Sequence, residues 1–162
     1  MTQLSFETRS EDETLEWARK LGVAFAESAR SGIAVGSVFV ALIGPLGAGK
    51  TVVTRGIVSG VDPQVAEEVR SPTFAIVDEL PTDPPIRHLD LYRLSGLLDL
   101  EAIGYREIYE ANGMVIVEWA DRVAEALPPE RIEIWIEPED VRRIRVVALG
   151  ALAERLVARA WS

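Results

Sequence analysis

One short segment combines residue types at a spacing that fits phosphate chemistry. Residues 44–51 read GPLGAGKT and match G-x-x-x-x-G-K-[ST] at every fixed position, between an apolar run and a helical stretch. Glycines let backbone N–H groups converge on phosphate oxygens, Lys50 would reach the β- and γ-phosphates, and the Thr51 hydroxyl would ligate Mg²⁺. A chain of this length would match by chance only about 0.006 times, so we predict a nucleotide site formed by Leu46, Gly47, Ala48, Gly49, Lys50 and Thr51.

A nucleotide loop of this kind also needs a nearby carboxylate that holds Mg²⁺ directly or through water. That acid usually ends a neighbouring buried strand. The apolar run 114–117 leads into Glu118, and the run 86–89 leads into Asp90. Glu118 follows the more apolar run and is the better candidate metal ligand, whereas Asp90 could orient the attacking water or be an additional metal partner. The candidate catalytic residues are therefore Lys50, Asp90 and Glu118, although either acid could instead cap a helix or pair with an arginine.

A further candidate lies between the expected loop helix and the next strand. Ser71-Pro72-Thr73 occupies the position where nucleotide hydrolases often place a residue that senses the γ-phosphate. The same three residues also fit a turn that opens a strand. Both interpretations of Thr73 stay open.

Composition limits the classes of partner. The 162 residues carry 17 Lys and Arg against 26 Asp and Glu, for a net charge of −9. An acidic surface repels phosphodiester backbones, so stable direct binding of nucleic acid is not expected. Cysteine is absent and His88 is the single histidine, which excludes thiolate chemistry and makes an imidazole zinc site very unfavourable. No signal segment or membrane-length apolar run is visible, so a cytoplasmic protein is expected.

Hydrophobic periodicity predicts strands that alternate with helices. Strands are expected at 4–8, 38–43, 74–77, 86–90, 114–117, 131–136 and 142–149, and helices at 11–30, 50–60, 97–110, 121–127 and 151–160. The strict alternation of 131–136 predicts a half-exposed strand that is antiparallel or lies at a sheet edge. With no repeat or linker, residues 1–162 are expected to form one α/β domain. Its predicted class is a three-layer domain like that of P-loop NTPases, with a mostly parallel sheet plus antiparallel strands.

Several short motifs together resemble the TsaE family, also called YjeE, whose members are small bacterial P-loop ATPases needed for threonylcarbamoyl modification of adenosine in tRNA. The resemblance spans residues 11–145, and the pieces at 88–94 and 118–119 are more specific to the family than the glycine-rich loop. The matching segments are EDET at 11–14, GPLGAGKT at 44–51, RG at 55–56, SPTF at 71–74, HLDLYRL at 88–94 and EW at 118–119.

The resemblance implies roles for individual residues. ATP and Mg²⁺ would be the cofactors, with Thr51 and Glu118 holding the metal and Asp90 supporting slow hydrolysis. Ser71 and Thr73 would belong to a switch-like loop. The remaining implied contacts to the nucleotide come from Glu11, Thr14, Trp119 and Arg142. Trp119 could instead face a partner, and Glu11 and Thr14 could instead cap the first helix. Two positions depart from the family pattern, Val52 in place of a second hydroxyl residue and Val141 in place of a glycine.

The resemblance also implies that the protein works in a complex with the TsaB and TsaD proteins, which transfer the threonylcarbamoyl group. Two other functions remain open at this point. A small-molecule kinase would need an arginine-bearing lid, and the one candidate loop, residues 81–85, is short and contains no arginine. A nucleotide-dependent scaffold that does not hydrolyse ATP would need only the binding loop.

Overall fold

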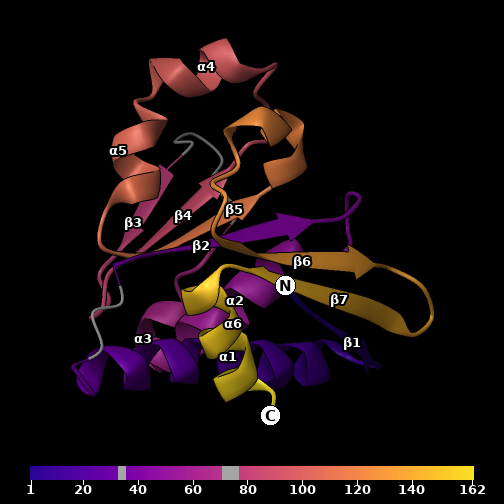
Figure 1. Ribbon diagram of the computed structural model, residues 1–162. Coiled ribbons are helices and arrows are strands. Elements are labelled where there is room, and N and C mark those ends of the chain that lie inside the picture. Colours follow the sequence, from indigo (N-terminus) through magenta and orange to yellow (C-terminus); the bar gives the residue numbers. More distant parts are fainter. Residues whose placement is uncertain (33–35, 71–76) are drawn as a thin grey trace.

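The strands form one mixed sheet in the computed structural model, which describes residues 1–32, 36–70 and 77–162. Within these residues seven strands lie in the order β1-β7-β6-β2-β5-β4-β3 (Figure 1). Their bounds are β1 Thr2–Thr8, β2 Ser37–Ile43, β3 Val77–Leu80, β4 Ile86–Asp90, β5 Gly113–Glu118, β6 Arg131–Glu137 and β7 Arg142–Leu149. The strand expected at 74–77 lies outside the described residues except for Val77, where β3 begins.

Parallel pairing is confined to the middle of the sheet. Strands β6, β2, β5 and β4 pair in parallel, whereas β1, β7 and β6 pair antiparallel on one side and β3 pairs antiparallel with β4 on the other. The two most apolar strands, β2 and β5, occupy the centre and are buried on both faces, as continuous apolar runs predict. The α/β class with parallel and antiparallel strands is confirmed, but the sheet is mixed rather than mostly parallel, because three of the six strand pairings among the described residues are antiparallel.

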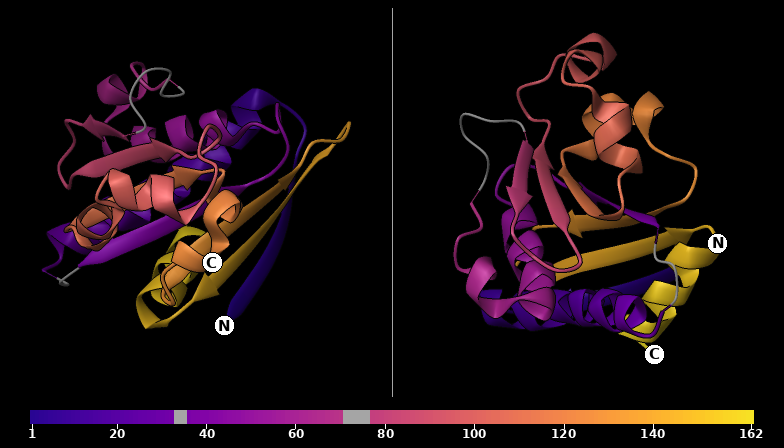
Figure 2. Two further views of the ribbon diagram at one scale, coloured as in Figure 1. Left: turned by 90° about the horizontal axis from the view of Figure 1, so that it is seen from above. Right: turned by 90° about the vertical axis from the view of Figure 1, so that its left-hand side faces the viewer.

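Helices cover both faces of the sheet and make three layers (Figure 2). One hydrophobic cluster joins the sheet to α1, α2, α3 and α6, and a second cluster joins the opposite face to α4, α5 and the 3-10 helix η1. Helix α1 buries Leu21 and Phe25, which recur at helical spacing, whereas Leu98 of α4 is 82% exposed. The bounds are α1 Glu11–Arg30, α2 Lys50–Val61, α3 Pro63–Ala66, α4 Leu97–Ala102, α5 Tyr105–Glu110, η1 Ala120–Ala126 and α6 Ala151–Ala160.

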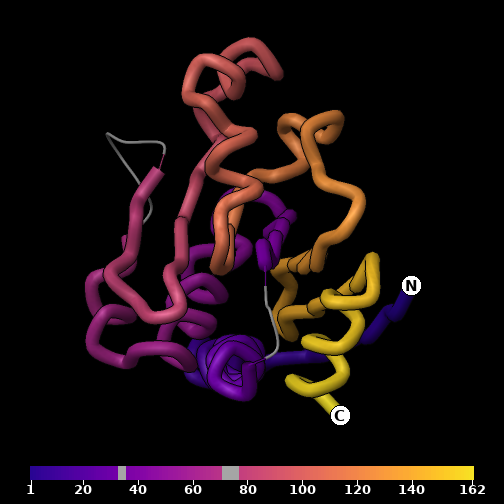
Figure 3. Tube along the Cα trace, turned by 60° about the vertical axis from the view of Figure 1, so that its left-hand side comes forward, coloured from indigo at the N-terminus to yellow at the C-terminus, as the bar shows by residue number. Residues whose placement is uncertain are grey.

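Both ends of the chain pack on the layer that contains α1. Figure 3 shows both termini on the same side of the molecule, with the C-terminus at the end of α6 and the N-terminus beside that helix. The Met1 amino group lies 2.6 Å from Glu154 Oε1 of α6. Trp161 stacks on Trp17 of α1, with ring centroids 4.7 Å apart, and its Nε1 donates to the Trp17 carbonyl at 3.1 Å. Among the described residues, no helix has the length and apolar character needed to span a bilayer.

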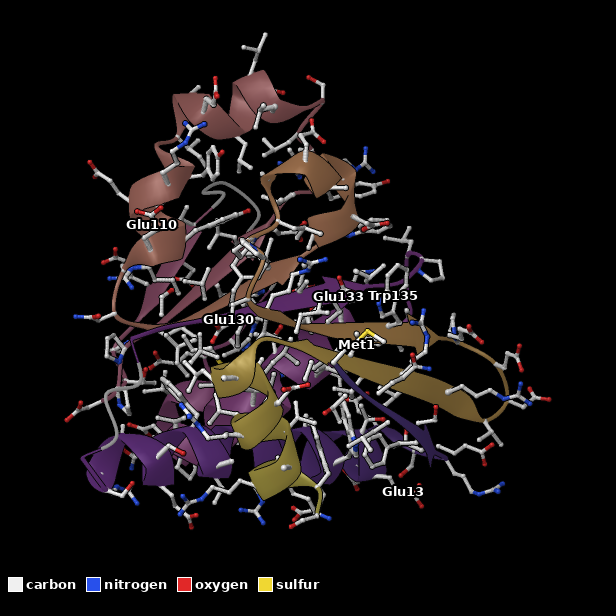
Figure 4. All side chains as sticks on the ribbon, viewed as in Figure 1. Met1, Glu13, Glu110, Glu130, Glu133 and Trp135 are labelled. Carbon is white, nitrogen blue, oxygen red and sulfur yellow. The ribbon has the colours of Figure 1, made fainter. Side chains whose placement is uncertain are left out.

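Residues 131–136 were expected to form a half-exposed strand, and this exposure is wrong. Strand β6 is antiparallel to β7 as expected, but its other side pairs in parallel with β2, so it lies inside the sheet and is mostly buried. Glu133 is only 9% exposed. Its carboxylate accepts from Arg131 Nε at 2.8 Å and from Trp135 Nε1 at 2.9 Å (Figure 4). Arg131, Glu133 and Trp135 therefore satisfy one another's hydrogen bonds on one face of a buried strand. A hydropathy pattern cannot distinguish such a strand from one with an exposed face.

Helices α1 and α2 approach each other closely along three glycines. A Cβ at Gly22 would overlap the Ile57 carbonyl oxygen, and one at Gly56 would lie 2.6 Å from Ala18 Cβ. A Cβ at Gly60 would overlap the backbone of α1. The helix that follows the glycine-rich loop is thus held against the first helix, and this packing positions both for the site described below.

Replacing Gly22 tests this close approach. Gly22→Ala gains helix propensity but overfills the contact, which typically costs about 1–3 kcal/mol. We expect thermal unfolding to show a melting temperature several degrees lower. Gly96→Ala is the matched control, because a Cβ there meets nothing within 4 Å. Equal melting temperatures for the two variants would contradict the close packing.

Candidate functional site

Three parallel strands end side by side at the candidate site. In the register of the sheet, Leu42 of β2 is opposite Glu118 of β5, and Glu118 is opposite Asp90 of β4. Backbone bonds continue this row beyond the strands, from Trp119 N to the Leu42 carbonyl at 3.1 Å and from Leu91 N to the Glu118 carbonyl at 3.0 Å. The glycine-rich loop follows β2, so it leaves the sheet beside both acids. Ligand sites of open α/β sheets lie at this carboxyl edge.

The loop has the backbone geometry that a phosphate site needs. Gly47 and Gly49 have φ values of 79° and 101°, which are left-handed conformations that favour glycine. Helix α2 begins at Lys50, and no side chain caps its first turn. Its N-terminal N–H groups and the positive end of the helix dipole therefore face the loop. Ala48 is fully buried, whereas Leu46 is 75% exposed at the tip.

Lys50 lies inside the loop and is almost completely buried. Its Nζ donates to the Gly44 and Pro45 carbonyls at 2.7 and 2.8 Å and lies 3.9 Å from the centroid of the Trp119 ring. Burial lowers the pKa of the Lys50 ammonium, and the nearby carboxylates, led by that of Glu118, oppose this change. A cation is therefore positioned where a phosphate on the loop would compete with two carbonyls for its hydrogens.

Glu118 and Thr51 form an oxygen pair at the edge of the sheet. The Glu118 side chain is 3% exposed, and its Oε1 and Oε2 accept from Thr51 Oγ1 at 3.0 and 3.3 Å. Oε2 also contacts His88 Nε2. Two hard oxygen ligands suit Mg²⁺, which commonly takes one or two protein ligands plus phosphate and water oxygens. In the described part of the chain, no group of three or more His, Cys, Asp or Glu residues could hold a metal alone. The donor set thus fits a Mg²⁺–phosphate complex rather than an all-protein cage.

Asp90 is next to this pair, half-buried at the end of β4. Its Oδ1 accepts from Tyr92 N at 2.9 Å, so it also closes a local turn. Burial raises the pKa of the Asp90 carboxyl, and the Glu118 charge adds to this effect. The Tyr92 N–H, His88 and Lys50 oppose it without cancelling it. Asp90 is therefore an acid with an elevated proton affinity beside the candidate metal ligands, which is the environment of many general bases.

Trp119 has an unusual backbone conformation directly after Glu118. Its φ of 59° makes it the one residue other than glycine with a positive φ in the described chain. Such a conformation is costly and often marks a functional site. The ring lies 4.9 Å from Tyr92 and faces Lys50, and the Arg122 guanidinium lies 5.0 Å from the Tyr92 ring. The strained turn thus places an aromatic surface beside the loop lysine.

Arg142 approaches the loop from β7, which lies on the opposite side of β2 from β5 and β4. Its Nη1 donates to Thr14 Oγ1 at 2.7 Å, and Thr14 Oγ1 lies 2.7 Å from Thr8 Oγ1. A Cβ at Gly49 would lie 3.1 Å from Arg142 Cζ, so the guanidinium packs directly on the loop. Arg142 Nε is buried and has no hydrogen-bond partner among the described residues. A half-buried guanidinium that touches the loop glycine can interact with an anion there.

The predicted site residues come together in part. Loop residues Leu46 to Thr51 adjoin Asp90, Glu118 and Trp119 on one side and Thr14 and Arg142 on the other. Glu11 is exposed at the start of α1 and lies 3.8 Å from Arg55 Nη1. Thr73, like Ser71, lies outside the described residues. His88 was considered only as an unsuitable zinc ligand, although its place two residues before Asp90 on one strand could have indicated a shared face.

Comparisons with known proteins agree with the resemblance seen in the motifs. The family model described as threonylcarbamoyl adenosine biosynthesis protein TsaE matches residues 8–145. The TsaE protein of Bacillus subtilis is 37% identical over 159 residues, which cover 96% of this chain and 92% of the relative. That of Streptomyces coelicolor is 36% identical and covers 82% and 90%. The crystal structure of Bacillus subtilis YdiB superposes with a TM-score of 0.72 at 32% identity, covering 98% of this chain and 94% of that chain.

The elevated pKa of Asp90 predicts a measurable effect on stability. Because the folded state holds this proton more tightly than the unfolded chain, the contribution of Asp90 to stability is complete below its ordinary pKa of 3.8 and is lost as pH rises through the folded value. Asp90→Asn keeps the oxygen that accepts from Tyr92. In protein free of nucleotide and Mg²⁺, it should raise the melting temperature at pH 7, and this gain should shrink toward pH 4.

Asp99 provides a control of the opposite sign. Hydrogen bonds from Ser95 lower the pKa of this exposed carboxyl. Its stabilising contribution is present above its ordinary pKa and is lost in acid. Asp99→Asn should therefore lower the melting temperature at pH 7. A lower melting temperature for Asp90→Asn as well would contradict the assigned environment of Asp90.

Proposed function

The chain belongs to the TsaE family of threonylcarbamoyl adenosine biosynthesis proteins, and from this premise we propose that it is a Mg²⁺-dependent ATPase. In this proposal it binds ATP, hydrolyses it slowly alone, and serves the complex that installs threonylcarbamoyl on adenosine in tRNA. The observation that carries the proposal is the row formed by the Thr51–Glu118 pair and Asp90 beside the glycine-rich loop. It combines a phosphate cradle, two metal ligands and a candidate base at one sheet edge.

Lys50 of the loop and the three residues of the row each have a role that their chemistry supports. Lys50 exchanges the Gly44 and Pro45 carbonyls for phosphate oxygens and neutralises the charge that develops on them. Thr51 and Glu118 hold Mg²⁺, which when bound supplies positive charge to the β- and γ-phosphate oxygens. Asp90 orients the attacking water and accepts its proton, a role for which a raised carboxyl pKa is suitable.

The residues on the other side of the loop contribute affinity. Arg142 is already packed against Gly49 and bonded to Thr14, so it can bind an anionic or polar group of the nucleotide with little loss of conformational freedom. Thr14 fixes the guanidinium in this position. Glu11 would contact the nucleotide only after leaving Arg55, a weak exposed pair.

The proposed partners are proteins, TsaB and TsaD. The net charge of −9 favours docking to a basic protein surface over direct contact with RNA. In this proposal the partners bind the RNA, and ATP hydrolysis by this chain resets or regulates the complex. A small-molecule kinase on the same scaffold is the alternative, and it requires transfer of phosphate to an acceptor rather than to water.

Reconstitution over several turnovers tests the proposal. Threonylcarbamoylation of tRNA by TsaB and TsaD should depend on this chain, and the partners should change its rate of ATP hydrolysis. Lys50→Ala should abolish both effects while circular dichroism stays native. Asp90→Ala should keep nucleotide binding but lose turnover and modification. Full modification by Asp90→Ala would favour the scaffold alternative, and rapid phosphate transfer to a small acceptor without any partner effect would favour the kinase.

A matched pair of arginine variants tests the nucleotide contact. Arg142 and Arg143 are neighbours on β7 whose side chains leave opposite faces of the strand, and Arg143 is exposed. Loss of one charged hydrogen bond costs about 1.5–3 kcal/mol, so Arg142→Met should weaken ATP binding about 10-fold or more. Arg143→Met should bind ATP as the wild type does. Calorimetric titration would disprove the Arg142 contact if both variants bound with equal affinity.

A further inference from the structure

The single histidine is buried next to the candidate metal ligand. His88 lies in the middle of β4, is 0% exposed, and pairs in register with Ile116 of β5. Its Nε2 contacts Oε2 of Glu118, which is two residues further along β5. Both side chains point to the face of the sheet that α2 covers, since Ile86 and Ile116 at alternating positions belong to that hydrophobic cluster. The imidazole therefore contacts the carboxylate on the buried face of the sheet that α2 covers.

The charge of Glu118 fixes the direction of this hydrogen bond. An ionised Glu118 carboxylate, the form that binds a metal ion, can only accept, so His88 Nε2 then carries the hydrogen. The other ring nitrogen, Nδ1, is buried and has no partner among the described residues. A buried polar atom without a partner costs stability. An apolar residue at this position would avoid that cost, so packing alone does not account for a histidine here.

The two carboxylate oxygens have different surroundings. Oε2 contacts His88, and Oε1 is the oxygen closer to the Thr51 hydroxyl, at 3.0 Å against 3.3 Å for Oε2. With Oε2 held, rotation of the carboxylate is restricted and Oε1 stays directed toward Thr51. Hydrogen bonds of this kind orient ligating carboxylates, and their loss typically lowers metal affinity by about 10–100-fold.

We propose that His88 is a positioning residue that orients the Glu118 carboxylate and thereby sets the affinity of the nucleotide site for Mg²⁺. The inference rests on the proposed function, because it assigns a role relative to the Mg²⁺ that Thr51 and Glu118 would hold. His88 contacts neither the nucleotide nor the metal in this proposal. Its effect is confined to the metal-dependent part of nucleotide binding.

Three substitutions separate orientation from packing. In His88→Gln, the amide nitrogen is as many bonds from Cα as His88 Nε2, so it can donate to Glu118 from a similar place. In His88→Asn the amide is one carbon shorter and falls short of the carboxylate. His88→Leu removes the donor and keeps an apolar core. We expect Gln to retain the function of His88 and Asn and Leu to lose it, with Asn and Gln as the matched polar pair.

The measurement compares ATP affinity with Mg²⁺ and with EDTA in the full chain. The ratio of the two affinities should fall about 10–100-fold in His88→Asn and His88→Leu and stay within about 3-fold of wild type in His88→Gln. Affinity in EDTA should remain unchanged in all three. A structural role would instead lower both affinities together with the melting temperature. An unchanged ratio in His88→Asn, or equal losses in Asn and Gln, would overturn the proposal.

A double-variant cycle tests the route through Glu118. Glu118→Gln should lower the same ratio. Adding His88→Asn to it should cause no further loss, because both changes disrupt the same interaction between His88 and the Glu118 carboxylate. Additive losses would show that His88 acts elsewhere. If the wild type bound ATP equally well with and without Mg²⁺, the proposed function and this inference would both fail. A metal-dependent wild type with an unaffected His88→Asn variant would remove the inference alone.

Discussion

The register of three parallel strands is the constraint on which the site depends. Because Leu42, Glu118 and Asp90 are opposite one another across β2, β5 and β4, the loop that follows β2 leaves the sheet beside two acids on neighbouring strands. A slip of one residue in β5 would turn Glu118 to the face covered by α4, α5 and η1 and away from Thr51. The apolar residues of β2 and β5, buried on both faces, fix this register. The hydrophobic core therefore determines where the polar chemistry lies.

The same arrangement concentrates charge in a region of low polarity. Lys50 and Glu118 are almost completely buried and Asp90 is partly buried, and desolvation shifts the pKa of Lys50 down and that of Asp90 up. Burial that destabilises isolated charges also strengthens their mutual attraction and their attraction to an incoming phosphate or cation. The strained turn at Trp119 adds a further local cost. The sheet and the close contact of α1 with α2 provide the stability that compensates for these costs.

The sequence predicted the parts of the site that depend on residues adjacent in the chain. The loop was predicted because its glycines and Lys50-Thr51 are contiguous, and Glu118 and Asp90 because each ends an apolar strand. The buried position of β6 was not predicted, because it depends on mutual satisfaction of Arg131, Glu133 and Trp135. The contact of Arg142 with Thr14 joins residues 128 apart in sequence and was not predicted, because the resemblance implied only that each residue contacts the nucleotide. Periodicity could have indicated the face of His88 but not its neighbour on β5, since the pairing of β4 with β5 is a property of the whole sheet.

Two kinds of preorganisation meet at the loop. On the side of β4 and β5, buried hydrogen bonds hold oxygen ligands in place; on the side of β7, the Arg142 guanidinium is packed on Gly49 before any anion arrives. Lys50 differs from both, because it must exchange two carbonyls and the Trp119 ring for phosphate. In the proposed function, nucleotide binding would therefore require the release of Lys50 from its present contacts. Because Trp119 contacts Lys50 and also packs against Tyr92, which is 44% exposed, this rearrangement would extend to an aromatic pair at the molecular surface, within reach of a docked protein.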